Sequence, residues 1–299
     1  MKIIYTILGI LLTFTTEVHC QEIETLKYEI QDLIKNKKSI VGVAINGMNA
    51  TDTLSINGDV QFPMQSVFKF PIALATLSEI DKENLSLDQE IEINKDDLLP
   101  GLWSPIQEKY PNGTVLTLAE IIQYTVALSD NVGCDVLLKL LGGPEVVESY
   151  FSSLGFKDFA VKINEKTMQS NWELQFQNWT TPKEANKILV SFYENKNELL
   201  SKVSYDFIWK VMKSTKTGKN RLKGQLPKEI TAAHKTGWSG KHKETGVTAA
   251  VNDIGIVFLP NGNYYIISVF ITSSSESLET NEKIIADISR ASWDYFMDK

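Results

Sequence analysis

The feature that most constrains the fold is a stretch near residue 70 that is apolar on almost every side. From Phe70 to Ile80 the sequence reads FPIALATLSEI. A helix that is hydrophobic all round is buried, so we expect it at the centre of the molecule with other elements packed around it. Pro71 fixes its start, because proline is tolerated only in the first turn of a helix.

Ser66 and Lys69 lie just before this helix and are three residues apart. On a helix this spacing puts both side chains on one face. A serine hydroxyl becomes a nucleophile only beside a base, and a lysine amine can be that base when burial or nearby positive charge lowers its pKa. Ser66 is also expected near the helix N-terminus, where backbone N–H groups favour developing negative charge. An S-x-x-K pair arises by chance about once in a chain of this length, so the pair alone does not establish catalysis.

The composition is that of an ordinary globular protein. The 299 residues are 43% hydrophobic and 22% charged, which is enough for one large domain or two interlocked ones. A net charge of -7 gives no basic surface for nucleic acid. The histidines His19, His234 and His242 are scattered, without the spacing of zinc ligands. We therefore expect no metal, no cofactor and no nucleic-acid partner, and a monomer that acts on a small molecule.

The first 20 residues predict a secretory signal peptide. A lysine at position 2 precedes an apolar run from Ile3 to Phe14, and cleavage is expected near Cys20. The alternative is a lipoprotein signal with Cys20 lipidated, although His19 fits poorly before a lipidated cysteine. The apolar run is short for a retained membrane anchor. We expect a periplasmic or secreted protein in which Cys134 is a packed small hydrophobe rather than a reactive thiol.

Strand patterns lie at both ends of the chain, and a helical block lies between them. Strands are predicted at residues 39–45, 52–57, 230–235, 246–259 and 264–272. Helices are predicted at residues 22–36, 118–127, 132–141, 144–154, 182–193 and 281–297. Little strand pattern is found between residues 81 and 211, where the polar stretch 164–182 is expected to be a functional loop.

This order of elements predicts a two-lobed α+β fold. One antiparallel sheet is built from both ends of the chain and is flanked by the terminal helices, and the helical block forms an inserted all-helical lobe. After the signal peptide at residues 1–20, we expect residues 21–62 and 212–299 in the α/β lobe and residues 63–211 in the helical lobe.

Two further short motifs follow Ser66 and Lys69. Residues 129–131 read SDN between two predicted helices, and residues 235–237 read KTG at the end of a predicted strand. Each is weak alone, because S-D-N often only caps a helix and K-T-G is often a strand end. The order S-x-x-K, S-D-N, K-T-G is much more specific and is the motif set of class A β-lactamases and penicillin-binding proteins.

The chain resembles class A serine β-lactamases over essentially its whole mature length, and within that class the PER/VEB/CfxA-like extended-spectrum branch. The stretches that carry the resemblance are SVFK at 66–69, LSDN at 128–131, NE at 164–165 with Met168, QNWTTP at 177–182, AHKTG at 233–237 and NDIG at 252–255. The resemblance implies a β-lactamase/transpeptidase-like fold, with the site in a cleft between a helical lobe and an α/β lobe.

For the catalytic residues the resemblance implies an acyl-enzyme mechanism. Ser66 attacks the lactam carbonyl and becomes acylated. The base is either Lys69, kept near neutrality by Lys235 and burial, or Glu165 acting through a water; both alternatives stay open. Ser129 relays a proton to the departing lactam nitrogen.

The resemblance also implies how the substrate is held. The backbone N–H groups of Ser66 and Trp238 form the oxyanion hole. Asn131 binds the acylamino side chain, and Lys235 and Thr236 hold the substrate carboxylate. The expected substrate-binding positions are Asn131, Gln169, Arg221, Thr236 and Gly237.

Glu165 decides between a hydrolase and relatives that keep their acyl-enzyme, because turnover needs a carboxylate that activates a deacylating water. The resemblance places the family glutamate at Glu165. Many class A enzymes have an asparagine four residues later to help hold this water. Here that position is Gln169, which can still donate and accept hydrogen bonds.

Two other positions depart from the usual pattern. Most class A enzymes supply an arginine for the substrate carboxylate from a strand of the sheet, but residues 245–249 contain none. Arg221 lies where some members supply it instead. Trp238 replaces the small polar residue that usually follows K-T-G, so its indole is expected to reshape the cleft while its backbone still serves the oxyanion hole.

These residues predict a β-lactamase that hydrolyses penicillins and cephalosporins and confers resistance to them, and the branch resemblance suggests oxyimino-cephalosporins. A D-alanyl-D-alanine peptidase or esterase on the same scaffold is a second hypothesis. A penicillin-binding sensor that is acylated without turnover is a third, and the presence of Glu165 argues against it.

Overall fold

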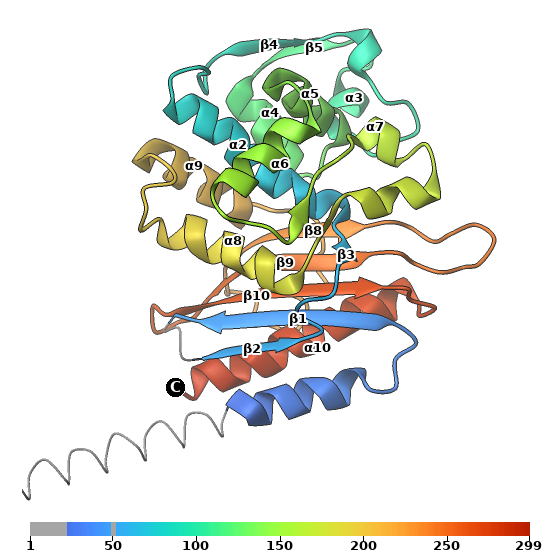
Figure 1. Cartoon of the computed structure of the whole chain (residues 1–299), viewed down its shortest axis with the longest axis vertical. Helices are drawn as coiled ribbons and strands as arrows, with labels where there is room; N and C mark the ends of the chain where they lie inside the picture. The colour runs from blue at the N-terminus through green and yellow to red at the C-terminus, as the bar shows by residue number, and fades with distance from the viewer. Residues whose placement is uncertain (1–22, 49–51) are drawn as a thin grey trace, which may run out of the picture.

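The computed structural model describes residues 23–48 and 52–299 and has an α+β architecture (Figure 1). Five strands form an antiparallel sheet in the order β2-β1-β10-β9-β8. Their bounds are β1 Ile40–Gly47, β2 Thr53–Ile56, β8 Ala232–Trp238, β9 Val251–Phe258 and β10 Tyr264–Thr272. β1 pairs with β10 along its full length, from Ile40 opposite Thr272 to Gly47 opposite Tyr265. The prediction of one sheet built from both ends of the chain is confirmed.

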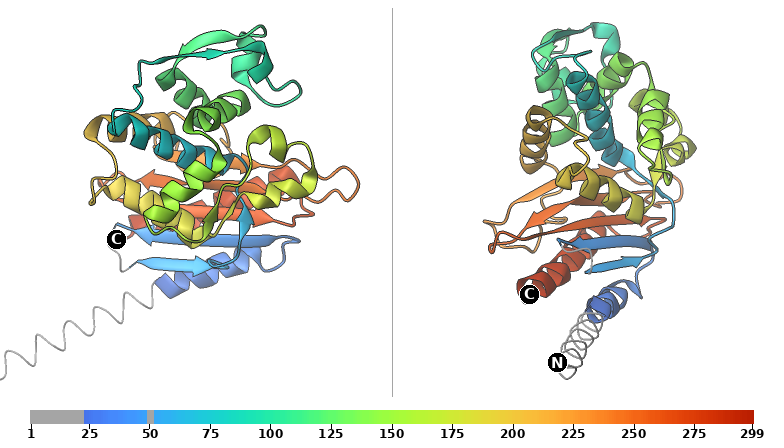
Figure 2. Two further views of the ribbon diagram at one scale, coloured as in Figure 1. Left: turned by 45° about the horizontal axis from the view of Figure 1, so that its top comes forward. Right: turned by 60° about the vertical axis from the view of Figure 1, so that its left-hand side comes forward.

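The two faces of the sheet are covered by different helices. The helix at residues 23–34 and α10 (Leu278–Met297) cover one face, as the right-hand view of Figure 2 shows. The helical block covers the other face. Along β10, the side chain of Ile266 belongs to the core under the helical block, and that of Ile267 to the core under the terminal helices. Both faces are buried, which explains why β10 reads as a continuous apolar run.

The central helix is α2 (Lys69–Asp81), and every residue from Lys69 to Ser78 is buried. It contacts α4, α5, α6 and α9. The helices of the block are α4 Leu118–Ala127, α5 Asn131–Leu141, α6 Pro144–Ser153, α8 Pro182–Glu194 and α9 Lys202–Lys213. The predicted buried central helix is therefore confirmed.

Local sequence signals fix the ends of the helices in this block. Thr117 and Glu120, which are three residues apart, form a reciprocal capping box at the start of α4. α5 ends at Gly142, whose φ of 99° lies in the left-handed region that glycine tolerates.

Four short strands lie between residues 81 and 211, where the sequence shows little strand pattern. β4 (Glu90–Ile93) pairs with β5 (Thr114–Thr117), and β6 (Phe159–Ala160) and β3 (Phe62–Pro63) both pair with β7 (Trp179–Thr180). These strands have two to four residues each, too few to show a periodic pattern. The stretch 164–182 likewise holds the short helix α7 (Glu165–Met168) and the 3₁₀ helix η3 (Trp172–Gln177). The remaining short elements are η1 Gln65–Phe68, η2 Lys95–Asp97 and α3 Pro105–Lys109.

The predicted signal peptide at residues 1–20, with Cys20, lies outside the described residues. Within residues 23–48 and 52–299, no helix combines the length and the hydrophobicity that a bilayer span requires. Cys134 is buried in α5 and has no disulfide partner among the described residues, and burial raises the pKa of its thiol well above its ordinary value. This agrees with its predicted packing role. The division of the chain at residues 62/63 and 211/212 into two lobes stays a prediction.

Candidate active site

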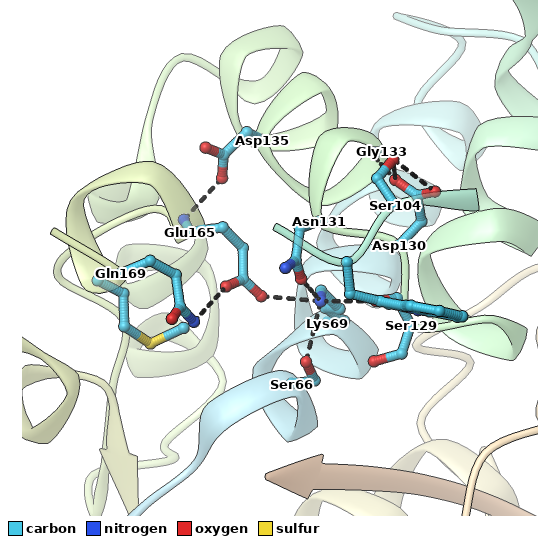
Figure 3. Close-up of polar contacts among 12 residues, drawn as sticks. Ser66, Lys69, Ser104, Ser129, Asp130, Asn131, Gly133, Asp135, Glu165 and Gln169 are labelled. Atoms are coloured by element: carbon cyan, nitrogen blue, oxygen red, sulfur yellow. Dashed lines mark hydrogen bonds and ion pairs between the residues drawn. The ribbon is translucent and has the colours of Figure 1, made fainter. Parts of the chain in front are cut away.

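Ser66 lies in η1, immediately before α2, and Lys69 is the first residue of α2. Lys69 Nζ donates a hydrogen bond of 2.9 Å to Ser66 Oγ, as Figure 3 shows. Gln65, just before the serine, has a φ of 46°, in the left-handed region. This tight turn brings the hydroxyl over the start of the helix, as the S-x-x-K spacing predicts.

The turn before Ser66 is held from the sheet. The side-chain amide of Asn252, on β9, donates to Pro63 O at 2.9 Å and to Met64 O at 3.1 Å. Gly237, on β8, allows the close approach of this segment, because a Cβ there would lie 2.5 Å from Met64 O. Two neighbouring strands from the C-terminal part of the chain therefore fix the position of the serine.

The Lys69 ammonium is fully buried and surrounded by acceptors. Its Nζ donates to Ser129 O at 3.1 Å and to Asn131 Oδ1 at 2.5 Å. It also forms an ion pair of 2.8 Å with Glu165 Oε1, and the side chains of the pair are 0% and 1% exposed. A buried amine and a buried carboxylate in contact, both beside a serine hydroxyl, provide a path for proton transfer.

Ser129 approaches the same centre from the opposite side, with a φ of 59° in the left-handed region. Lys235 Nζ donates to Ser129 Oγ and to Thr236 O, each at 2.9 Å. Burial, and next the positive charge of Lys69, hold the pKa of Lys235 well below its ordinary value. The two lysines therefore lie on either side of the turn at Ser129, which we call the Ser129 turn.

Asp130 anchors this turn through side-chain contacts that the sequence did not predict. Its carboxylate accepts from Ser104 Oγ at 2.9 Å, from Ile106 N at 2.7 Å and, as the N-cap of α5, from Gly133 N at 2.8 Å. Burial raises the pKa of this carboxyl in spite of these donors. The indole of Trp103 adds a hydrogen bond of 2.9 Å to Leu128 O.

Glu165 is positioned through the first turn of α7. Its backbone N–H donates to Asp135 Oδ1 at 2.7 Å, and that of Lys166 donates to Asp135 Oδ2 at 3.0 Å. Burial raises the pKa of Asp135 to about 6. Sequence reasoning missed Asp135, although it follows Asn131 by four residues on α5 and so shares its helix face.

The loop around Glu165 depends on two amides. The side chain of Asn178 accepts from the N–H of Lys162 and of Ile163 and donates to Ile163 O. Gln169 Nε2 lies 3.5 Å from Glu165 Oε2, which is at the outer limit of a hydrogen bond. Gln169 therefore lies beside the carboxylate, as predicted, without holding it tightly.

Arg221 lies behind β8, with its guanidinium held by the protein. Its Nη1 donates to Gly237 O and to Asn252 O, each at 3.0 Å, and its Nε forms an ion pair of 3.2 Å with Glu282. Only 6% of the residue is exposed, where it lines the site cavity.

One cavity of about 320 Å³ brings together most of the predicted residues. The predicted residues that line it are Ser66, Ser129, Asn131, Gln169, Arg221, Thr236, Gly237 and Trp238. Lys69, Glu165 and Lys235 are buried behind this surface. Sequence reasoning missed four further lining residues, which are Gln65, Trp103, Thr217 and Gly218. Trp103 and Trp238 are 56% and 51% exposed, so two large indoles stand at the mouth.

A second cavity of about 460 Å³ adjoins the first, with Gln65 and Gln169 in both linings. It lies between the loop that carries α7 and η3 and the loop between β8 and β9. The rings of Trp172 and His242, one from each loop, meet edge to face with centroids 5.0 Å apart. Among the described residues, no group of three or more His, Cys, Asp or Glu side chains is arranged to hold a metal ion.

The sequence and the fold are similar to those of known β-lactamases. A model of the β-lactamase enzyme family matches residues 25–296. The chain is 53% identical to β-lactamase VEB-1 of Pseudomonas aeruginosa over the full length of both chains. It is 41% identical to extended-spectrum β-lactamase PER-1 of the same organism, covering 92% of this chain and 88% of that one. The crystal structure of the TLA-1 extended-spectrum β-lactamase superposes with a TM-score of 0.88 at 45% identity, covering 91% of this chain and 98% of that one. The chain therefore belongs to the β-lactamase enzyme family, within class A and on the branch that includes VEB-1, PER-1 and TLA-1.

Proposed function

We propose that this protein is a serine β-lactamase that hydrolyses penicillins and cephalosporins through an acyl-enzyme on Ser66 and so confers resistance to them. The single observation that carries the proposal is the buried chain of contacts from Ser66 Oγ through Lys69 Nζ to Glu165 Oε1, with steps of 2.9 and 2.8 Å. This chain joins the nucleophile to a carboxylate that can activate water.

In the acylation step, Ser66 Oγ forms a bond to the lactam carbonyl carbon while its proton passes to a base. Lys69 is one candidate for the base, and Glu165 acting through a water is the other. The lactam C–N bond then breaks, and Ser129 passes a proton to the nitrogen as it accepts the Ser66 proton from the base. The contact of 2.9 Å between Lys235 Nζ and Ser129 Oγ supports this relay. The backbone N–H groups of Ser66 and Trp238 are proposed to stabilise the oxyanion.

In the deacylation step, Glu165 accepts a proton from water as the water oxygen attacks the ester carbonyl. The ester C–O bond breaks, and Ser66 recovers its proton. The position of Glu165 supports hydrolysis over the two alternatives. A penicillin-binding sensor, or a peptidase that keeps its acyl-enzyme, needs no buried carboxylate next to the lysine. We propose that Gln169 contacts this water only weakly, because its amide lies 3.5 Å from the carboxylate.

The substrate carboxylate is proposed to bind at the end of the cavity that holds Thr236 and Gly237, near the charges of Lys235 and Arg221. Arg221 is fixed by two carbonyls and Glu282. We therefore propose that Arg221 attracts the substrate carboxylate mainly through its positive charge. Asn131 is proposed to bind the acylamino side chain of the substrate.

We propose further that oxyimino-cephalosporins are among the substrates. PER-1 and TLA-1 are described as extended-spectrum enzymes, and the second cavity beside Gln65 and Gln169 offers room for a bulky side chain. We also propose a periplasmic or secreted location. The mass of the mature protein would show whether the chain is cleaved after Cys20, as a signal peptide at residues 1–20 predicts, or before a lipidated Cys20.

Replacing Glu165 by glutamine tests the proposed hydrolysis. Glutamine cannot accept the water proton, so the E165Q acyl-enzyme should accumulate. Intact-protein mass spectrometry after mixing with a penicillin should show the protein plus one substrate mass, and steady-state turnover should fall by about 100-fold or more. The matched control is E173Q, an exposed glutamate on the same loop, which should turn over like the wild type. Undiminished turnover in E165Q would show that another group activates the water.

A further inference from the structure

The segment between α9 and Arg221 brings a hydroxyl into the Ser66 cavity for which the mechanism above has no role. Thr217 Oγ1 lies 2.6 Å from Thr236 Oγ1, and both residues line the cavity. Thr236 is nearly buried, whereas Thr217 is half-buried. In the part of the chain that the structure describes, neither hydroxyl has another hydrogen-bond partner.

The neighbours of Thr217 hold it firmly against β8. Thr215 Oγ1 donates to His234 O at 2.7 Å, and Lys216 N donates to Ala127 O at 2.9 Å. Gly218 has a φ of 66°, and a Cβ at this position would lie 2.4 Å from Thr236 Cγ2. The segment is therefore tied to both the sheet and the helical block, and the distance between the two hydroxyls does not depend on a freely rotating loop.

The direction of the hydrogen bond between the two threonines follows from what a carboxylate can accept. A hydroxyl has one proton to donate and lone pairs to accept with, and a carboxylate only accepts. If Thr236 donates to Thr217, no proton of Thr236 is left for a substrate carboxylate. If Thr217 donates to Thr236, the Thr236 proton is free to point into the cavity. A bound anion near Lys235 and Arg221 selects the second arrangement.

We propose that Thr217 is a positioning residue for substrate binding. Its O–H donates to Thr236 Oγ1 and thereby directs the Thr236 proton at the substrate carboxylate. The inference rests on the proposed function, in which Thr236 holds that carboxylate. It adds a residue outside the three motifs, and it concerns binding alone, since no bond is formed or broken at either threonine.

Two variants and a matched pair of substrates test this role. T217V removes the hydroxyl and keeps the branched shape, whereas T217S keeps the hydroxyl. The substrates are a chromogenic cephalosporin with its free carboxylate and the methyl ester of the same compound. T217V should raise KM for the free acid about 5- to 10-fold with kcat changed less than about 2-fold, the size expected for a weakened hydrogen bond to a charged group. The KM for the ester should change less than about 2-fold in T217V. In T217S, the KM for the free acid should return most of the way to the wild-type value.

The matched control is T215V, which removes a neighbouring hydroxyl that bonds to the β8 backbone rather than facing the cavity. Any loss of activity in T215V should be equal for acid and ester. An equal loss for both substrates in T217V, or a loss that T217S does not recover, would show that the hydroxyl has only a structural role and would overturn this inference. Absence of wild-type turnover of the free acid would overturn the proposed function itself, so the two failures are distinguishable.

Discussion

At the scale of single residues, the sequence predicts the groups that carry chemistry better than the groups that hold them. Ser66 and Lys69 were predicted from a motif and Glu165 from the family resemblance, and the structure brings them into one chain of contacts. Asp135 was not, because its partners are backbone N–H groups of α7. A motif does not show which backbone a side chain will face, since that depends on how two helices pack.

Asp135 should make the stability of the fold depend on pH. Its pKa is raised from 3.8 to about 6 by burial, so between these values the folded state holds a proton that the unfolded state releases. The free energy of unfolding therefore falls as pH rises through this window. D135N removes the ionisation. The free energy of unfolding of D135N minus that of the wild type should therefore rise by about 2 kcal/mol from about pH 4.5 to about pH 7.5.

Urea unfolding of wild type and D135N at the two pH values measures this effect. The control is D59N, which changes a carboxylate that is 79% exposed. Its stability relative to wild type should stay the same at both pH values. A D135N difference that is also independent of pH would contradict the assignment of the titration to Asp135.

At the scale of elements, the positions of the helix ends were predictable from local signals, and the distant contacts that hold some of those ends were not. The capping box of α4 needs only Thr117 and Glu120, which are three residues apart. The start of α5 depends on Asp130, whose carboxylate also binds Ser104 and the N–H of Ile106 from another segment. The short strands were missed because two to four residues are too few to show a periodic pattern.

Removing these two N-caps should lower the free energy of unfolding by different amounts. T117A removes an exposed cap and should lower the free energy of unfolding by about 1 kcal/mol, with activity retained. D130A leaves the buried N–H groups of Gly133 and Ile106 without an acceptor and should cost about 3 kcal/mol or more. It should also lower kcat, because the Ser129 turn precedes this cap. Urea unfolding and steady-state kinetics measure both effects, and equal costs for D130A and T117A would argue against an anchoring role for Asp130.

At the scale of the whole molecule, the sequence predicted that both ends of the chain build one sheet, and that the central helix is buried. It did not predict how the nucleophile is tied to that sheet. Asn252 makes this connection, because its side chain bonds to the backbone on both sides. It donates to Pro63 O and Met64 O, just before Ser66, and it accepts from Ile271 N on β10 at 3.3 Å. An asparagine at the second position of a buried strand is a local hint of such a role.

Because Asn252 holds the turn before Ser66, its replacement should slow catalysis beyond what the loss of stability alone explains. N252A leaves buried backbone groups without partners and should lower the free energy of unfolding by about 2–4 kcal/mol. I288A, in the core under the terminal helices, should cost about the same by leaving a cavity. Only N252A should slow acylation, because it alone frees the turn that positions Ser66. Pre-steady-state acylation rates, measured on E165Q backgrounds at a temperature where both proteins are folded, separate the two effects. Equal acylation rates in the two variants would mean that the sheet supports the fold without positioning the nucleophile.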